Sequence, residues 1–108
     1  MTEDDVRYLI ASFDGVTVDG RSDEANTIYS IDGEIVAVVK NGSNPLQLSL
    51  RCDYNLGELL CNQYESVSRS NELNKRRFIS VLMTGQLADD EVRDQIRHAY
   101  EQTKELIG

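Results

Sequence analysis

The stretch Thr27-Ile-Tyr-Ser-Ile-Asp-Gly-Glu-Ile-Val-Ala-Val-Val-Lys40 decides the fold of this 108-residue chain. Two β-favouring runs, 27–31 and 34–40, flank the pair Asp32-Gly33. Because Asp and Gly tolerate the positive φ angles of a type I′ turn, this pattern predicts a β-hairpin. The run from Ile35 to Val39 is apolar at every position. Strands of this kind are covered on both faces, so we expect this one to lie centrally in a sheet.

The next strand outward from the hairpin shows strict alternation. Leu46, Leu48, Leu50 and Cys52 fall on one face, and Gln47, Ser49 and Arg51 fall on the other. This pattern predicts a half-buried strand over 46–52 with one solvated face. A further β-rich run at 78–83 adds a fourth main strand, and shorter β-favouring stretches lie at 16–18 and 65–68.

Three segments, at residues 2–13, 53–64 and 89–107, have the apolar spacing of helices. Thr2 and Asp53 are expected N-caps of the first two, and Asp89 or Asp90 of the third. No regular βα alternation runs through the chain, which favours an antiparallel sheet. The prediction is a single α+β domain over residues 1–108, a mostly antiparallel sheet packed with helices. The expected core is Leu9, Ile10, Val36, Val38, Leu48, Leu50, Leu60, Ile79, Val81, Ile96 and Ala99.

Composition and charge exclude several classes of protein. The chain is 40% hydrophobic and 28% charged, an ordinary balance for a globular domain. Nineteen acidic residues against 11 basic ones give a net charge of −8, which repels phosphate backbones and anionic lipid. This argues against a general DNA-coating or membrane-surface role. The N-terminus has no secretory signal pattern and there are only two cysteines, so we expect a cytoplasmic protein with reduced thiols.

One segment reverses the local charge. The predicted loop over 69–77 holds four cations, Arg69, Lys75, Arg76 and Arg77, and one acid. Arginine and lysine in this density can contact phosphate, and Asn71 and Asn74 can add hydrogen bonds. The alternative is a solvated loop whose cations offset neighbouring acids.

Other candidate residues have simpler interpretations. His98 has acidic neighbours in the helix and is expected to form a surface ion pair. Cys52 and Cys61 are expected as small buried hydrophobes, because no further residues complete a zinc site. The acids of the first turns at 3–5 and 89–91 are expected to serve the helix termini. The tyrosines are expected mainly in or near the core, with exposed ones able to stack on bases.

Most of the chain, from about residue 28 to 107, resembles the YjbR/MmcQ family of small bacterial proteins. The resemblance rests on the order and spacing of several short motifs. Phe78, Glu34 and Ala99 stand where that family usually has Trp, Lys and Ser. The matching segments are Ser30-Ile-Asp-Gly-Glu-Ile-Val-Ala37, Leu48-Ser-Leu-Arg-Cys-Asp53, Leu73-Asn-Lys-Arg-Arg-Phe-Ile-Ser-Val-Leu82, Gly85-Gln-Leu-Ala-Asp-Asp-Glu91 and Ile96-Arg-His-Ala-Tyr100.

The resemblance implies a fold like that of frataxin and CyaY, and it brings a loose DNA-binding label. Two functions follow as hypotheses: a non-enzymatic domain that contacts nucleic acid through the 69–77 loop, or a protein–protein interaction module with no nucleic-acid role. An iron-binding role through Glu3, Asp4 and Asp5 is the least favoured. No nucleophile–base pair, metal signature or glycine-rich phosphate loop is present, so no catalytic residue, metal or cofactor is expected.

Overall fold

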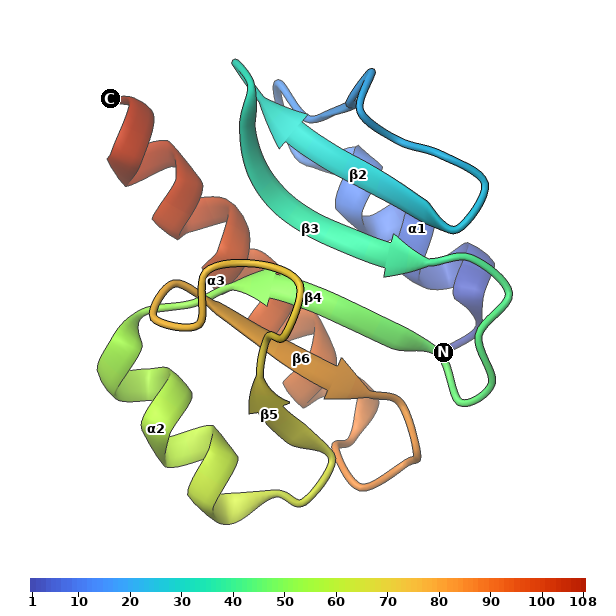
Figure 1. The fold of residues 1–108 in the computed structure, drawn as a ribbon, viewed down its shortest axis with the longest axis vertical. Helices are drawn as coiled ribbons and strands as arrows, with labels where there is room; N and C mark the ends of the chain where they lie inside the picture. The colour runs from blue at the N-terminus through green and yellow to red at the C-terminus, as the bar shows by residue number, and fades with distance from the viewer.

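A computed structural model describes all residues from Met1 to Gly108. Six antiparallel strands form one sheet in the order β1-β2-β3-β4-β6-β5. Figure 1 shows α1 and α3 behind the sheet and α2 beside β5. The elements are α1 (Glu3–Ser12), β1 (Thr17–Val18), β2 (Asn26–Ile31), β3 (Glu34–Lys40), β4 (Gln47–Arg51), α2 (Tyr54–Gln63), β5 (Val67–Arg69), β6 (Phe78–Leu82) and α3 (Asp89–Ile107). The predicted α+β fold is therefore confirmed.

The hairpin that decides the fold forms as predicted. Asp32 and Gly33 both have positive φ angles, 50° and 82°. Strand β3 lies inside the sheet between β2 and β4, and Val36, Ala37, Val38 and Val39 are all buried. A shift in the pairing of β2 with β3, at Tyr29 and Ser30, lets Val36 join the core as well.

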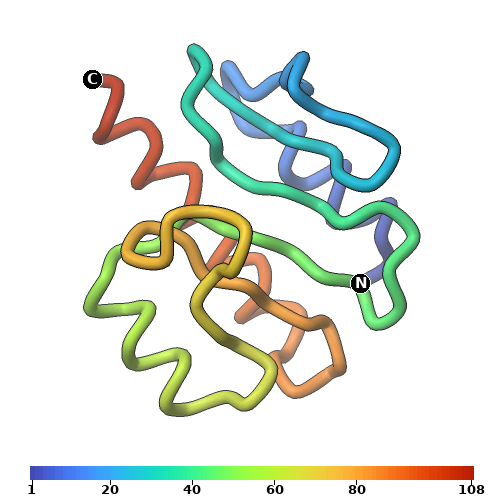
Figure 2. The backbone as a smooth tube through the Cα atoms, viewed as in Figure 1, coloured from blue at the N-terminus to red at the C-terminus, as the bar shows by residue number.

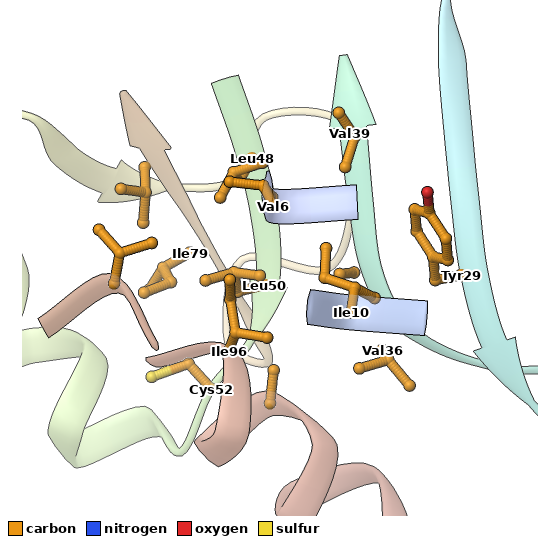
Figure 3. Close-up of a cluster of buried hydrophobic side chains, with 14 of the residues drawn as sticks. Val6, Ile10, Tyr29, Val36, Val39, Leu48, Leu50, Cys52, Ile79 and Ile96 are labelled. Carbon is orange, nitrogen blue, oxygen red and sulfur yellow. The ribbon is translucent and has the colours of Figure 1, made fainter. Parts of the chain in front are cut away.

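One face of the sheet and all three helices enclose the hydrophobic core. Paired residues of neighbouring strands point to the same side, so Ala37, Leu50 and Ile79 form one row across the sheet. Val39, Leu48, Val81 and Val67 form the next row. Figure 3 shows Val6 and Ile10 of α1 and Ile96 of α3 packing on these rows.

Two details of the predicted core and caps were wrong. Leu9 is only partly buried, because Val6 and Ile10 are the α1 residues that face the sheet. Ala88 is the N-cap of α3, since Asp89 and Asp90 already lie in its first turn. The Glu91 carboxylate accepts from the Ala88 amide, and Asp89 pairs instead with the N-terminal ammonium group.

The expected solvated face of β4 was also wrong. Ser49 and Arg51 are each only 8% exposed. Ser49 is small and lies between Val38 and Ser80 of the neighbouring strands. The Arg51 guanidinium packs over the Phe78 ring, 4.6 Å from its centroid, and its Nε donates to the Ile35 carbonyl at 2.8 Å.

Gly57 allows α2 to lie close to the sheet. A Cβ atom at this position would be 2.6 Å from Nη1 of Arg69 and 3.3 Å from Cγ2 of Ile79. The absence of a side chain therefore makes room for the Arg69 guanidinium beneath the helix. This space explains a glycine within a helix, where it costs about 1 kcal/mol relative to alanine.

Truncation of the core should test this packing. Leu50 and Ile96 are 1% and 0% exposed, and replacing either with Ala should lower the free energy of unfolding by about 2–5 kcal/mol. Leu59 is 65% exposed, so Leu59→Ala is the matched control and should cost less than about 0.5 kcal/mol. Urea denaturation measures all three, and a core variant as stable as the parent would remove that residue from the core.

Burial of Cys52 predicts low thiol reactivity. Burial raises the pKa of this thiol to about 11, and the nearby Asp53 carboxylate acts in the same direction. At pH 8 only about one molecule in 1,000 then carries the reactive thiolate. In a Cys61→Ser variant, a thiol reagent should modify Cys52 slowly at pH 8, faster as the pH rises toward 11, and at once after unfolding in guanidinium. Equal rates in the folded and unfolded states would contradict this.

Candidate functional site

The predicted basic loop folds into a tight turn between β5 and β6. The Asn74 carbonyl accepts from the amides of Arg77 and Phe78, and the Asn74 side chain accepts from the Arg76 amide. These bonds hold Lys75, Arg76 and Arg77 at the surface, where all three side chains are exposed. We call these three residues the basic turn. Figure 2 shows this segment, in yellow to orange, lying near the start of α2.

The basic turn contains no ion pair. The seven ion pairs of the protein involve the N-terminus and six arginines, none of them from the turn. Among the 11 lysine and arginine side chains, only Lys40, Lys75, Arg76, Arg77 and Lys104 are therefore unpaired. Three of these five are consecutive, which concentrates the free positive charge at one place on an acidic protein.

Arg69 differs from the other three predicted cations. It is the last residue of β5, not a loop residue as predicted. Its Nη2 donates to the Glu58 carboxylate at 2.5 Å and to the Tyr54 carbonyl at 3.1 Å. The Arg69 charge is thus used within the protein, to hold the start of α2 against the sheet.

Tyr54 connects Arg69 to the basic turn. The guanidinium carbons of Arg69 and Arg76 lie 4.5 and 4.6 Å from the centroid of the Tyr54 ring. Cation–π contacts of this length are worth about 0.5–1 kcal/mol at exposed sites. The tyrosines are expected either to pack in the core or to expose a ring that can stack on bases. Tyr54 fits neither role, because it is 41% exposed and its ring already contacts two guanidinium groups.

Arg51 is a site residue that sequence reasoning missed. Alternation placed it on a solvated strand face, but the Cys52 amide donates to the Arg77 carbonyl at 2.8 Å and brings residue 51 beside the basic turn. Burial lowers the pKa of Arg51, and the like charge of Arg77 acts in the same direction, against the opposing effect of Glu34. The nearest acid is Glu34, at 3.6 Å from Nη2. No sequence signal near residue 51 indicates this contact between distant segments.

These residues surround a pocket of about 420 Å³. It lies where the end of β4, the start of α2, the basic turn and the last turns of α3 meet. Three arginines and a single carboxylate face it, which suits an anionic ligand. The lining residues are Arg51, Cys52, Asp53, Tyr54, Asn74, Arg76, Arg77, Gln102 and Leu106.

Cys52 lines this pocket and His98 contacts its neighbour Asp53, but the two do not form a reactive pair. The predicted surface ion pair of His98 was wrong, because the half-buried ring accepts a hydrogen bond from the Asp53 amide through Nε2 at 3.1 Å. That nitrogen is therefore occupied. Cys52 is a free, buried thiol with a raised pKa, and Cys61 is free and partly buried. Neither thiol is activated as a nucleophile.

The acidic clusters serve structural roles. Thr2 and Asp5 form a capping box at the start of α1, and Glu3 pairs with Arg7. In α3, Asp90 pairs with Arg93, and Glu91 accepts from the Tyr64 hydroxyl. No group of three or more His, Cys, Asp or Glu side chains is placed to hold a metal ion. No helix is long and apolar enough to cross a membrane.

Known proteins resemble this chain in both sequence and structure. No family model matches it. It is 30% identical over 81 residues to the uncharacterized protein YjbR of Escherichia coli K12, a match that covers 75% of this chain and 69% of that protein. YjbR of Escherichia coli O157:H7 matches equally.

Two crystal structures share the fold. A Deinococcus radiodurans protein with the domain DUF419 superposes with a TM-score of 0.82 at 22% identity, over 92% of this chain and 75% of that one. A Pseudomonas syringae protein superposes with a TM-score of 0.77 at 15% identity, over 95% of this chain and 99% of that one. At these identities the structures show the fold alone. The sequence match shows common descent with the uncharacterised YjbR proteins of Escherichia coli, and the chain belongs to the YjbR family.

Proposed function

We propose that this protein binds nucleic acid, without catalysis, through phosphate contacts at the basic turn. The observation that carries the proposal is the absence of ion pairs at Lys75, Arg76 and Arg77 in a chain with 19 carboxylates. In such an acidic protein, three consecutive cations without an acidic partner are available to an external anion. Arginine and lysine side chains are common donors to the phosphate oxygens of nucleic acids.

The interface is smaller than the sequence suggested. We leave Arg69 out of it, because Glu58 and the Tyr54 carbonyl occupy its Nη2 and its Nη1 is buried beneath Gly57. Three phosphate contacts give a slope of log affinity against log salt of about −2.7 on duplex DNA. Four contacts would have given about −3.6.

The rest of the protein opposes binding. Its net charge is −8 although the basic turn is positive, so phosphates approach only this one region. We therefore expect binding at physiological salt to be weaker than the usual non-specific range of about 10⁻⁴ to 10⁻⁶ M. The alternative, a protein-interaction module, is favoured by the same acidity and by exposed apolar side chains such as Leu59 and Val18.

Removal of the basic turn should abolish binding. Fluorescence anisotropy with labelled duplex and single-stranded DNA at about 50 mM salt compares the parent with a Lys75→Ala, Arg76→Ala, Arg77→Ala variant. We expect binding by the parent and none by the variant, with little change in melting temperature because exposed cations contribute little stability.

The matched control removes three cations elsewhere. Lys40 and Lys104 are unpaired, and Arg97 is 3.7 Å from Asp94, so a Lys40→Ala, Arg97→Ala, Lys104→Ala variant changes the net charge equally. We expect this variant to retain most of the binding. No binding by the parent, or equal losses in both triple variants, would refute the proposed interface and leave the protein-interaction role ahead.

A further inference from the structure

We infer that the pocket behind the basic turn binds a terminal phosphate monoester, either that of a free nucleotide or that of a phosphorylated strand end. This inference deepens the proposed function and rests on it in taking the phosphate to belong to a nucleotide. It concerns a recessed site centred on Arg51, whereas the basic turn is a surface.

Arg51 is a buried cation with unused hydrogen-bond donors. Its side chain is 9% exposed, and what remains accessible lines the pocket. Nε donates to the Ile35 carbonyl, but neither terminal nitrogen makes a hydrogen bond, because Glu34 at 3.6 Å is too distant for one. A cation this buried ordinarily has a close, hydrogen-bonded partner, whereas its ion pair with the half-exposed Glu34 carboxylate is long. The unused N–H donors of the Arg51 terminal nitrogens therefore indicate an anion in the pocket.

Two further arginines converge on the same space. The bond from the Cys52 amide to the Arg77 carbonyl places Arg77 close enough to affect the Arg51 charge, and the Tyr54 ring holds Arg76 at the rim. The three guanidinium groups at this pocket repel one another, and an anion bound among them would offset that repulsion. Planar guanidinium groups bind phosphate oxygens in pairs, which one lysine does not do.

The recess selects a terminal phosphate over an internal one. An internal phosphodiester has sugars on both sides and one charge, so it lies along the exposed basic turn. A monoester has one substituent, three free oxygens and a charge of about −1.5 to −2 at pH 7, so it can enter end-on and reach Arg51. A volume of about 420 Å³ lies within the range of about 300–1,000 Å³ typical of small-molecule pockets.

The remaining lining suits the organic part of a nucleotide. Asn74 and Gln102 add side-chain amides. The Asp53 carboxylate accepts from the Leu56 amide as the N-cap of α2, which fixes its position. A carboxylate and amides pair with the hydroxyl and amino groups of a nucleoside and disfavour a second anionic group.

The first experiment compares ligands. Calorimetry or NMR titration uses adenosine monophosphate, adenosine and inorganic phosphate, and anisotropy uses single strands with either a 5′-phosphate or a 5′-hydroxyl. We expect the monophosphate to bind at least about tenfold more tightly than adenosine. The 5′-phosphorylated strand should likewise bind more tightly than its 5′-hydroxyl counterpart.

The second experiment tests whether the phosphate binds beside Arg51, with a variant that is expected to gain affinity. Glu34 competes for Arg51, so Glu34→Gln should raise affinity for the monophosphate by about 2- to 5-fold, a change that misfolding cannot produce. Glu24→Gln, which removes the same charge just before β2 and away from the hairpin turn that precedes Glu34, is the control and should have little effect. Gln102→Glu should lower the affinity, and Asn62→Asp on α2 should not.

The outcomes separate this inference from the proposed function. Equal binding of the two strands, lost in the basic-turn variant, would overturn the terminal-phosphate site and support the nucleic-acid surface. Binding of the monophosphate without binding of either strand would support the terminal-phosphate site and overturn the nucleic-acid surface. No gain in Glu34→Gln, or a phosphoserine peptide bound as tightly as the monophosphate, would overturn the assignment, and no binding of any ligand would overturn both.

Discussion

Strand β4 is paired on both sides, and the rest of the structure depends on this double pairing. Ala37 and Val39 of β3 face Leu50 and Leu48 of β4, which in turn face Ile79 and Val81 of β6. The N-terminal hairpin and the C-terminal strands meet only through this central strand. The same pairing sets Arg51 opposite Phe78, and the next main-chain bond, from Cys52 to Arg77, continues it to the basic turn. The position of the candidate site thus follows from the register of the core.

The protein has an acidic body and one basic region, which consists of the exposed basic turn and the buried Arg51. The basic turn is exposed, and its charges are screened by salt as surface charges are. Arg51 lies deeper, where a partner anion is screened much less. Added salt should therefore weaken an anion's contacts with the basic turn more than its contacts with Arg51.

Local patterns in the sequence predicted the parts of the fold that local physics determines. The Asp32-Gly33 turn, the alternation of β4 and the apolar stripe of α3 each depend on residues close together in the chain. The same patterns placed Lys75, Arg76 and Arg77 correctly in a loop. They could not show that Arg69 pairs with Glu58, that His98 accepts from Asp53 or that Arg51 is buried. Each of these contacts joins segments that only the tertiary fold brings together.

The space beneath Gly57 has a consequence for sequence variation in this protein. Because a Cβ atom there would meet the Arg69 guanidinium before anything else, the two positions are not independent. A side chain at 57 displaces Arg69 from Glu58 and from the Tyr54 ring, unless residue 69 is shortened at the same time. The effects of changes at 57 and 69 on stability are therefore non-additive. A substitution at 57 that destabilises the protein by itself should cost less when residue 69 is also shortened. Arg76 packs on the same Tyr54 ring as Arg69, so changes at this pair of positions extend to a contact at the rim of the pocket.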